Sequence, residues 1–261
     1  MIEAVLFDLG GTMHTSDSPE GWDARYAARL LERLEDYGIH LGLSPDALAL
    51  MLKTNCEDYK HHTEQTLREL PAAEIWSEYY LRGLGVSREA LEPIAEELSF
   101  RYDYDRTRIL RRPYLKQTVE TLRDMGIRMG VISNIISTSV VSHFLAEYGI
   151  EKDMECVVLS SVTGIRKPDP EIFRVAERAM NLKPEQLAYV GDTLSRDVRG
   201  VRNAGWRCMI QIRNPSIAHR DRGLEHSGLV PDYLIDNLAE IPAIIQKENR
   251  KEIDAPFDTA R

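Results

Sequence analysis

The segment Ala4-Val5-Leu6-Phe7-Asp8-Leu9-Gly10-Gly11-Thr12, near the start of the chain, decides the fold. Its first four residues are apolar, which predicts a short strand buried on both faces, as strands of a parallel sheet are. The strand ends at Asp8, and two glycines follow shortly after it. Ligands of parallel α/β sheets bind outside the carboxyl ends of the strands, so Asp8 lies where a functional residue is expected.

Apolar runs of strand length alternate with helical patterns along much of the remaining chain. This alternation is typical of βαβ units, and it predicts an α/β fold with a doubly wound parallel sheet. The predicted strands are residues 4–7, 127–132, 156–159, 187–190, 208–212 and 231–235. The predicted helices that accompany them are residues 114–125, 138–148, 170–180, 197–204 and 238–247.

Residues 18–108 interrupt this alternation, because they contain amphipathic helical patterns and no convincing strand. The helical patterns cover residues 22–37, 45–59, 72–84 and 88–102. We therefore expect a helical domain, residues 18–108, inserted into an α/β core made of residues 1–17 and 109–247. The polar stretches 15–20 and 106–113 are the expected hinges.

Two further segments lie outside the regular pattern. Residues 213–231 contain Asn, Pro, Ser, Gly and several charges, and they follow a predicted strand. They are therefore expected to emerge at the same edge of the sheet as the other functional loops. Residues 248–261 are highly charged and are expected to form a peripheral tail.

The composition excludes several classes of protein. Of the 261 residues, 43% are hydrophobic, which is too many for a disordered chain. Asp and Glu exceed Lys and Arg by 42 to 33, and this net charge of −9 argues against nucleic acid as a partner. No apolar run reaches the roughly 18–20 residues that span a bilayer, and the first residues do not resemble a signal peptide. With three widely spaced cysteines, we expect a cytoplasmic protein with reduced thiols.

Other polar residues stand at the same edge of the predicted sheet as Asp8. Ser133 and Asn134 follow one strand, and Asp192 follows another, with Asp197 five residues later. Lys167 precedes a Pro-Asp-Pro sequence that opens the predicted helix 170–180.

In this order, Asp8…Thr12, Ser133, Lys167-Pro168 and Gly191-Asp192…Asp197 resemble the motifs of the haloacid dehalogenase-like (HAD) superfamily of hydrolases. The resemblance covers nearly the whole chain, and it implies a Rossmann-like core with an α-helical cap inserted after the first motif. The catalytic residues it implies are Asp8, Ser133 and Lys167. The residues it implies for substrate binding are Gly11, Thr12, Asn134 and Lys167. The Mg²⁺ ligands it implies are Asp8, the backbone carbonyl of Gly10, Asp192 and Asp197.

The chemistry of these residue types supports the same roles. A carboxylate such as Asp8 can act as a nucleophile and form an aspartyl-phosphate, which divides phosphoryl transfer into two easier steps. Three carboxylates close together repel one another, by about 4 kcal/mol per pair at 4 Å and an effective dielectric constant near 20. A hard cation such as Mg²⁺ relieves this repulsion and takes oxygen ligands, and Lys167 adds a further positive charge. A small phosphorylated substrate can then enter a protein of negative net charge.

Gly10 departs from the family pattern. Phosphatases and mutases of the family usually place a second aspartate at this position, whose carbonyl binds the metal and whose side chain protonates the leaving group. The carbonyl remains in this chain, whereas the acid, which contributes about 10²–10⁴-fold to such reactions, does not. Three explanations stay open. The substrate has a good leaving group, such as an acyl phosphate; another group, such as His14 or a residue of the cap, supplies the proton; or turnover is weak or absent.

We predict a Mg²⁺-dependent hydrolase, a phosphatase that acts on a small phosphorylated metabolite through an aspartyl-phosphate on Asp8. The main alternative is a weakly active or non-catalytic phosphate-binding protein on the same scaffold, which the glycine at position 10 favours. A 2-haloacid dehalogenase is the weaker alternative, because family members with that activity usually lack the motif that contains Asp192 and Asp197.

Overall fold

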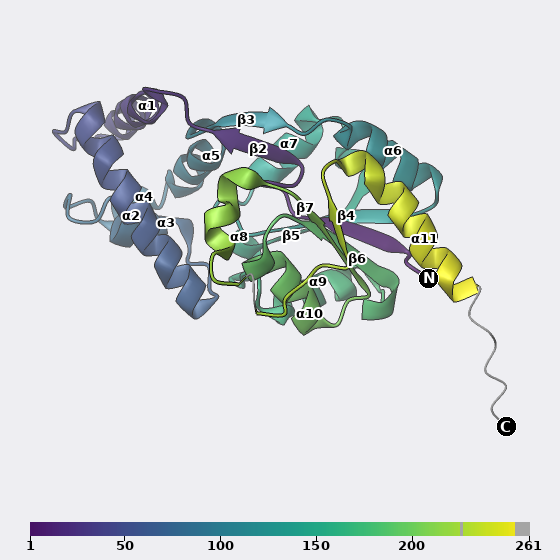
Figure 1. Ribbon diagram of the computed structural model, residues 1–261. Helices are drawn as coiled ribbons and strands as arrows, with labels where there is room; N and C mark the ends of the chain where they lie inside the picture. The colour runs from purple at the N-terminus through teal and green to yellow at the C-terminus, as the bar shows by residue number, and fades with distance from the viewer. Residues whose placement is uncertain (225–226, 254–261) are drawn as a thin grey trace.

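The computed structural model describes residues 1–224 and 227–253, and a six-stranded sheet lies at its centre (Figure 1). The strand order is β5-β4-β1-β6-β7-β8, and every neighbouring pair is parallel. The strands are β1 (Ala4–Phe7), β4 (Arg128–Ser133), β5 (Met154–Leu159), β6 (Leu187–Gly191), β7 (Cys208–Ile212) and β8 (Tyr233–Ile235). The predicted α/β fold with a parallel sheet is thereby confirmed.

Strand β1 lies between β4 and β6, and this position explains why its end carries a functional residue. The chain proceeds from β1 to β4 and β5 on one side, and then to β6, β7 and β8 on the other. The strand order therefore reverses at β1, and such a switch point opens a crevice at the carboxyl edge of the sheet. Asp8 follows β1 there, and its backbone N–H donates to the carbonyl of Val190 in β6 at 2.8 Å.

Helices cover both faces of the sheet, and alternate residues of β1 point to opposite faces. Val5 and Phe7 join a buried cluster with residues of α6, α7 and α11, whereas Ala4 and Leu6 join a second cluster with residues of α9 and α10. The helices are α6 (Leu115–Asp124), α7 (Val140–Glu147), α8 (Ser160–Thr163), α9 (Pro170–Met180), α10 (Arg199–Ala204) and α11 (Ile241–Ile253). Burial on both faces accounts for the wholly apolar sequence of β1.

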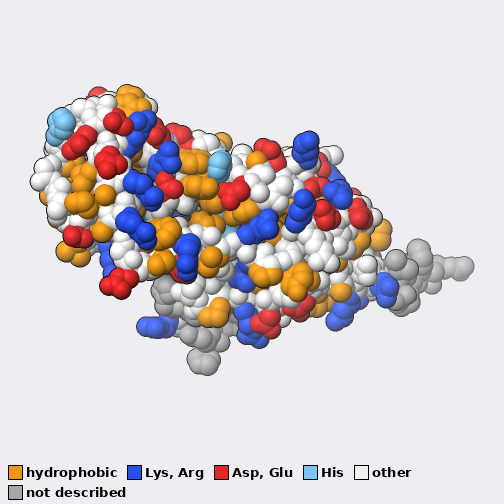
Figure 2. All heavy atoms as spheres, turned by 90° about the horizontal axis from the view of Figure 1, so that it is seen from above, with side chains coloured by type: hydrophobic (Ala, Val, Ile, Leu, Met, Phe, Trp, Pro, Cys, Tyr) orange, Lys and Arg blue, Asp and Glu red, His pale blue; other side chains and the backbone are white. Residues whose placement is uncertain are grey.

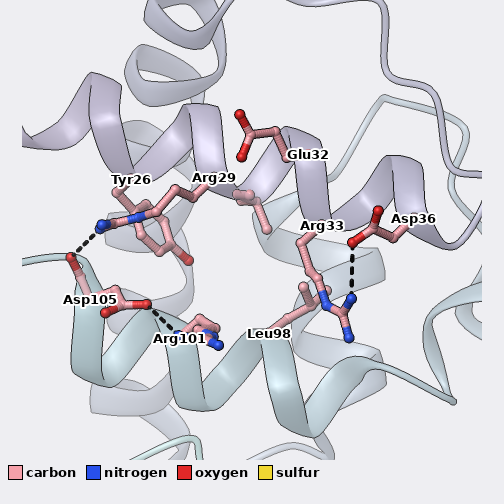
Figure 3. Close-up of a pocket in the computed structure, with 9 residues that line it drawn as sticks. Tyr26, Arg29, Glu32, Arg33, Asp36, Leu98, Arg101 and Asp105 are labelled. Atoms are coloured by element: carbon pink, nitrogen blue, oxygen red, sulfur yellow. Dashed lines mark hydrogen bonds and ion pairs between the residues drawn. The ribbon is translucent and has the colours of Figure 1, made fainter.

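Residues 18–108 form a group of helices that projects from one end of the sheet, so that the molecule is elongated (Figures 1 and 2). These helices are α1 (Trp22–Asp36), α2 (Pro45–Thr66), α3 (Ala72–Ile75), the π-helical turn η1 (Trp76–Tyr80), α4 (Arg88–Leu91) and α5 (Ala95–Asp105). They enclose a hydrophobic cluster of their own, in which Trp76 is fully buried. We call this group the helical insert. A surface cavity of about 250 Å³ lies between α1 and α5 (Figure 3).

The two expected hinges are paired strands rather than loops. β2 (His14–Asp17) and β3 (Arg108–Arg111) form an antiparallel ribbon through which the chain enters and leaves the insert. Their sequences are too polar to predict strands, and the pairing is reinforced by an ion pair between Arg108 and Asp17. The boundaries at residues 17 and 109 expected from the sequence fall inside this ribbon.

The C-terminal part departs from the expected pattern in one further way. Helix α11 continues to Ile253, so the first residues of segment 248–261 are helical, and the Tyr233 hydroxyl donates to Glu248 at 2.5 Å. Residues 254–261 lie outside the described part of the chain. Among the described residues, no helix is both long and apolar enough to span a membrane.

Candidate active site

A cavity of about 240 Å³ lies at the carboxyl edge of the sheet, where the helical insert meets the core. The loops after β1, β4 and β6 contribute residues to it, as the sequence predicts. The wall includes Asp8, Gly10, Gly11, Ser133, Asn134, Lys167 and Asp192. We call this space the central cavity.

Lys167 places a buried positive charge beside Asp8 in the central cavity. Its Nζ atom lies 3.0 Å from Oδ1 of Asp8 and 2.7 Å from Oδ1 of Asp197, and 2% of its side chain is exposed. It also donates to the hydroxyl of Tyr189 at 2.8 Å, and that hydroxyl donates in turn to the carbonyl of Ile132. Tyr189 therefore helps to fix Lys167, a role that its place in a buried strand did not reveal.

Asp8, Asp192 and Asp197 bring carboxylate oxygens within 4.8 Å of one another. Burial raises the pKa of Asp8, against the opposing effect of the Lys167 ammonium. Burial and the neighbouring carboxylates also raise the pKa of Asp192, to about 7. Burial acts in the same direction on Asp197, but the charges of Lys167 and Arg196, with the hydrogen bonds from Lys167 and Thr193, together outweigh it and hold the pKa of Asp197 below its usual value. Within the described residues, the ion pairs of Lys167 reach Asp8 and Asp197, whereas Asp192 forms none.

The hydrogen bonds of the two later aspartates distinguish their roles. Oδ2 of Asp197 accepts from the backbone N–H groups of Asp192 and Thr193 and from the Thr193 hydroxyl, so this carboxylate orients the loop after β6. Asp192 accepts from Asn214 through Oδ2, while its buried Oδ1 has no hydrogen-bond partner in the described structure. A buried carboxylate oxygen without a donor, beside Asp8, fits a divalent cation with oxygen ligands.

The two glycines after Asp8 differ in what they require. Gly11 has a φ of +85°, and a Cβ there would lie 1.7 Å from Oδ2 of Asp192, so only glycine fits. Gly10 adopts an ordinary φ, and a Cβ built there meets no atom within 4 Å. The backbone therefore does not require glycine at position 10.

The carbonyl of Gly11 accepts two hydrogen bonds from Arg112, at 2.9 and 2.6 Å. Arg112 is therefore a positioning residue that the sequence did not reveal.

The remaining predicted residues take different positions. Ser133 is buried in the cavity wall. The side chain of Asn134 donates to the carbonyl of Lys167 and accepts from its N–H, so it holds the backbone that carries the lysine. Thr12 does not line the cavity, and its buried hydroxyl has no partner among the described residues.

His14 lines the central cavity but is poorly suited to donate a proton. Its Nδ1 lies 2.8 Å from the Tyr148 hydroxyl, and its ring packs against Phe144. Burial lowers the pKa of His14 to about 4, so the imidazole is neutral at pH 7. The expectation that His14 could replace the missing acid finds no support in this environment.

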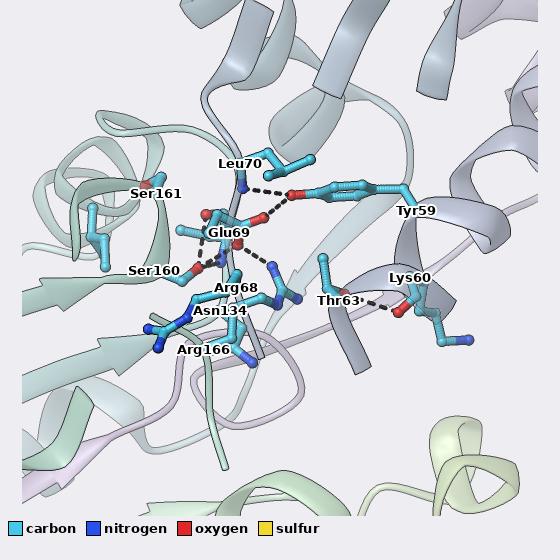
Figure 4. A network of polar contacts seen from close by, with 12 residues as sticks. Tyr59, Lys60, Thr63, Arg68, Glu69, Leu70, Asn134, Ser160, Ser161 and Arg166 are labelled. Atoms are coloured by element: carbon cyan, nitrogen blue, oxygen red, sulfur yellow. Dashed lines mark hydrogen bonds and ion pairs between the residues drawn. The ribbon is translucent and has the colours of Figure 1, made fainter. Parts of the chain in front are cut away.

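The helical insert is tied to the core by a buried polar network centred on Glu69 (Figure 4). Its carboxylate accepts from the hydroxyls of Tyr59 and Ser160 and pairs with Arg166. Arg166 and Glu69 lie 97 residues apart in the chain, so no local pattern of the sequence predicts this pair. The network fixes the insert over the carboxyl edge of the sheet.

A family model described as haloacid dehalogenase-like hydrolase matches residues 2–205. The chain belongs to the haloacid dehalogenase-like hydrolase family. The matched range includes every residue of the acidic cluster and Lys167. The predicted family and hydrolase class are thus confirmed.

Relatives from this family cover most of the chain. The glyceraldehyde 3-phosphate phosphatase of Methanopyrus kandleri is 28% identical over 249 residues, which span 95% of this chain and 98% of that protein. The phosphoserine phosphatase of Thermus thermophilus is 30% identical over 187 residues, 64% of this chain and 71% of that protein. Among solved structures, the 2-haloacid dehalogenase from Pseudomonas syringae pv. Tomato DC3000 matches 95% of this chain and 100% of its own, with a TM-score of 0.64 at 22% identity. At that identity the likeness shows the fold alone.

Proposed function

We propose that this protein is a Mg²⁺-dependent phosphatase that transfers the phosphoryl group of a small metabolite to Asp8 and then to water. The observation that carries the proposal is the position of Asp8 at the end of β1, 3.0 Å from the buried Lys167 and beside Asp192, whose Oδ1 has no partner. The phosphatase names of the Methanopyrus and Thermus relatives support the same reaction.

The proposed reaction proceeds in two steps. A carboxylate oxygen of Asp8 forms a bond to phosphorus as the bond to the leaving oxygen breaks, and water then hydrolyses the aspartyl-phosphate to release phosphate and restore Asp8. Lys167 stabilises the negative charge on the phosphoryl oxygens, and the Ser133 hydroxyl hydrogen-bonds to one of them. Asn134 and Tyr189 keep Lys167 in place through the contacts described above. Asp197 holds the loop after β6 and the ammonium of Lys167.

The residues that would hold Mg²⁺ are Asp8, Asp192 and the carbonyl of Gly10, with Asp197 as a further ligand or as the group that orients them. When bound, the cation supplies positive charge that offsets the carboxylates and the substrate phosphate.

We also propose that the helical insert acts as a cap that excludes water from the central cavity and selects the substrate. We further propose a cytoplasmic location, which the odd number and wide spacing of the cysteines in the sequence support.

The alternative function is phosphate binding with little turnover, and Gly10 is the observation that favours it. Replacing Gly10 by aspartate tests this alternative, because the backbone has room for the side chain. A phosphatase that relies on an acyl phosphate substrate differs from a binding protein in its turnover of acetyl phosphate. Carbon–halogen hydrolysis is tested separately by halide release from a 2-haloacid.

The proposal is tested with purified protein, p-nitrophenyl phosphate and acetyl phosphate, in Mg²⁺ and in excess EDTA. We expect Mg²⁺-dependent phosphate release that falls to background in Asp8→Asn and persists in the control Asp36→Asn, which alters an exposed carboxylate of the insert. Phosphate release by Asp8→Asn at the parent rate would show that Asp8 is not the nucleophile. Measurable phosphate binding without turnover of any ester or acyl phosphate would favour the binding protein.

A further inference from the structure

Three arginines from separate parts of the chain line the central cavity. Arg106 directly follows helix α5 of the insert, Arg196 belongs to the turn after β6, and Arg220 belongs to η5 (Pro215–Asp221) in the segment after β7. We call them the arginine cluster. They face the same small space as Asp8 and Lys167.

The arginine cluster has no carboxylate partner. Within the described residues, none of the three side chains forms an ion pair within 4.0 Å or a hydrogen bond. The Nε atoms of Arg106 and Arg220 are buried and unpartnered. A buried N–H without an acceptor costs free energy, so a fold that keeps two such groups beside a cavity is expected to satisfy them when a ligand binds.

No ion pair within the described residues neutralises Arg106, although the Asp103 carboxyl lies near enough for Arg106 to lower its pKa. Its guanidinium carbon lies 4.4 Å from the centre of the Tyr102 ring, and its nearest titratable neighbours also include Tyr26, Tyr80 and Cys56. Burial raises the pKa of each of these groups above its ordinary value, so they are uncharged at neutral pH.

Arg220 lies near charges of both signs but forms no ion pair in the described part of the chain. Burial lowers the pKa of Arg220, and the positive charge of Arg196 lowers it further. The nearest carboxylates, on Asp192, Glu57 and Glu64, act on Arg220 through space without an ion pair. Arg220 is held over the cavity by its neighbour Asp221, whose carboxylate accepts from the N–H groups of Leu194 and Ser195.

We propose that the arginine cluster is a second anion subsite, which binds a carboxylate or a second phosphate on the organic part of the substrate. This inference rests on the proposed phosphatase function, since Lys167, Ser133 and the acidic cluster already provide for the phosphoryl group that is transferred. The planar guanidinium pairs with either anion through two parallel hydrogen bonds. The substrate class is therefore a small phosphate ester or acyl phosphate that carries a second negative group.

Matched substrate pairs test the subsite. Phosphoserine carries a carboxylate where phosphoethanolamine carries a hydrogen atom, and 3-phosphoglycerate carries a carboxylate where glyceraldehyde 3-phosphate carries an aldehyde. Glucose 1,6-bisphosphate and glucose 6-phosphate represent the second-phosphate case. We expect kcat/KM to be about 10- to 100-fold higher for the doubly anionic member of at least one pair. A hydrogen bond to a charged group contributes a factor of this size. The pair that shows the preference identifies the anion.

Variants then connect the preference to the arginines. Arg106→Met and Arg220→Met are each expected to reduce the ratio of kcat/KM within the preferred pair by about tenfold or more. Arg101→Met is the matched control, because Arg101 lies on α5 but is exposed and pairs with Asp105. A ratio near one for every pair in the parent protein, together with turnover of p-nitrophenyl phosphate, would overturn the subsite and leave the phosphatase function intact.

A binding measurement decides the subsite even if turnover fails. Titration calorimetry of Asp8→Asn with Mg²⁺ compares phosphoserine with phosphoethanolamine, and the same comparison is made with Arg220→Met added. Tighter binding of the doubly anionic ligand that disappears with Arg220→Met supports the subsite. Equal affinities in both proteins, for this pair and for the two other pairs, contradict it.

A different observation concerns the acid that Gly10 lacks. Asp103, on helix α5 of the insert, lines the central cavity, and so does Gly10. A Cβ built at Gly10 meets no atom within 4 Å, so the space that a side chain would fill there is open. One oxygen of Asp103 accepts from the N–H of Ser137 at 3.0 Å, which fixes the carboxyl in the wall. Burial, together with the carboxylates of Glu69 and Glu96 and against the effect of Arg106, raises the pKa of Asp103 to about 7.

We infer that Asp103 takes the place of the missing side chain at position 10 as the proton donor. Its carboxyl proton passes to the leaving oxygen as the P–O bond breaks and the bond from Asp8 to phosphorus forms. The resulting Asp103 carboxylate then accepts a proton from the water that attacks the aspartyl-phosphate, so the original state returns. This inference also rests on the proposed function.

The dependence on the leaving group tests this role. Asp103→Asn is expected to lower kcat/KM for an alkyl phosphate by about 10²-fold or more, and for acetyl phosphate by much less, because an acyl phosphate needs little protonation. Adding Gly10→Asp to Asp103→Asn is expected to restore kcat/KM for the alkyl phosphate. An equal loss on both substrates that Gly10→Asp does not reverse would mean that Asp103 only maintains the structure.

Discussion

The central cavity and the cavity between α1 and α5 have nearly the same volume, about 240 and 250 Å³, but they differ in the pairing of their charges. In the cavity between α1 and α5, which we call the outer cavity, Arg33 pairs with Asp36 and Arg101 pairs with Asp105 (Figure 3). Arg33 also pairs with Glu97. In the central cavity, acidic and basic groups remain only partly compensated. Volume therefore does not identify the functional site, whereas uncompensated buried charge does.

The outer pairs have an evident structural use. Arg33 on α1 makes two hydrogen bonds of 2.6 Å to Glu97 on α5, and the N–H of Arg29 reaches the carbonyl of Asp105. These contacts hold the two helices together over the apolar side chains of Leu30 and Leu98. Because the groups are partly exposed and satisfied by one another, the outer cavity offers little to an incoming ligand.

Substitutions in the two cavities are expected to differ most in their effect on the free energy of unfolding of the protein. Replacing Lys167 by methionine leaves Asp8 and Asp197 buried without their counter-charge. Removal of one partner from a buried pair costs about 3–5 kcal/mol, so the free energy of unfolding in urea is expected to fall by that amount. Lys60→Met, which removes a partly exposed partner of Glu57, is the control. A loss in Lys167→Met no larger than in the control would show that Lys167 does not compensate the acidic cluster.

The sequence predicts the residues of the central cavity that follow strands, because strand ends are visible in a local pattern. Asp8, Ser133 and Asp192 each end an apolar run, and the edge of a parallel sheet brings such ends together. Lys167 was identified through its neighbours and the family resemblance. These local signals do not depend on how the insert packs.

The residues that the sequence did not reveal come from segments that meet only in the folded chain. Asp103 and Arg106 lie near the end of a helix, where their spacing resembles an ordinary solvated face, and Arg220 lies in an irregular segment. Strands β2 and β3 were missed for a related reason, since each is stabilised by its partner and not by its own composition. Tertiary proximity, which no single segment encodes, decides these features.

A smaller effect is expected from His14, which lines the central cavity and makes the stability of the protein depend on pH. The pKa of the buried His14 is lowered to about 4 from an ordinary value of 6.5, so the unfolded chain binds a proton more readily than the folded one. Stability present above pH 6.5 is therefore lost as the pH falls toward 4, by about 2 kcal/mol between pH 7 and pH 5. In the His14→Gln variant, the free energy of unfolding is expected to fall less between pH 7 and pH 5. Urea unfolding at the two pH values measures the effect, and His40→Gln, at an exposed histidine, is the control.

The smallest expected effect comes from the outer cavity. Arg33→Met removes two ion pairs, one with Glu97, in which the side chains are 36% and 33% exposed, and one with the more exposed Asp36. Exposed and partly exposed pairs contribute about 0–1 kcal/mol, because water and salt screen them, so the unfolding free energy is expected to change by no more than that. Phosphatase activity and the ratios within the matched substrate pairs are expected to stay at the parent values, since no residue of the central cavity changes. A selectivity shift in Arg33→Met as large as in Arg220→Met would mean that the charge of the insert as a whole, and not the unpartnered arginines that line the central cavity, sets the preference for a second anion.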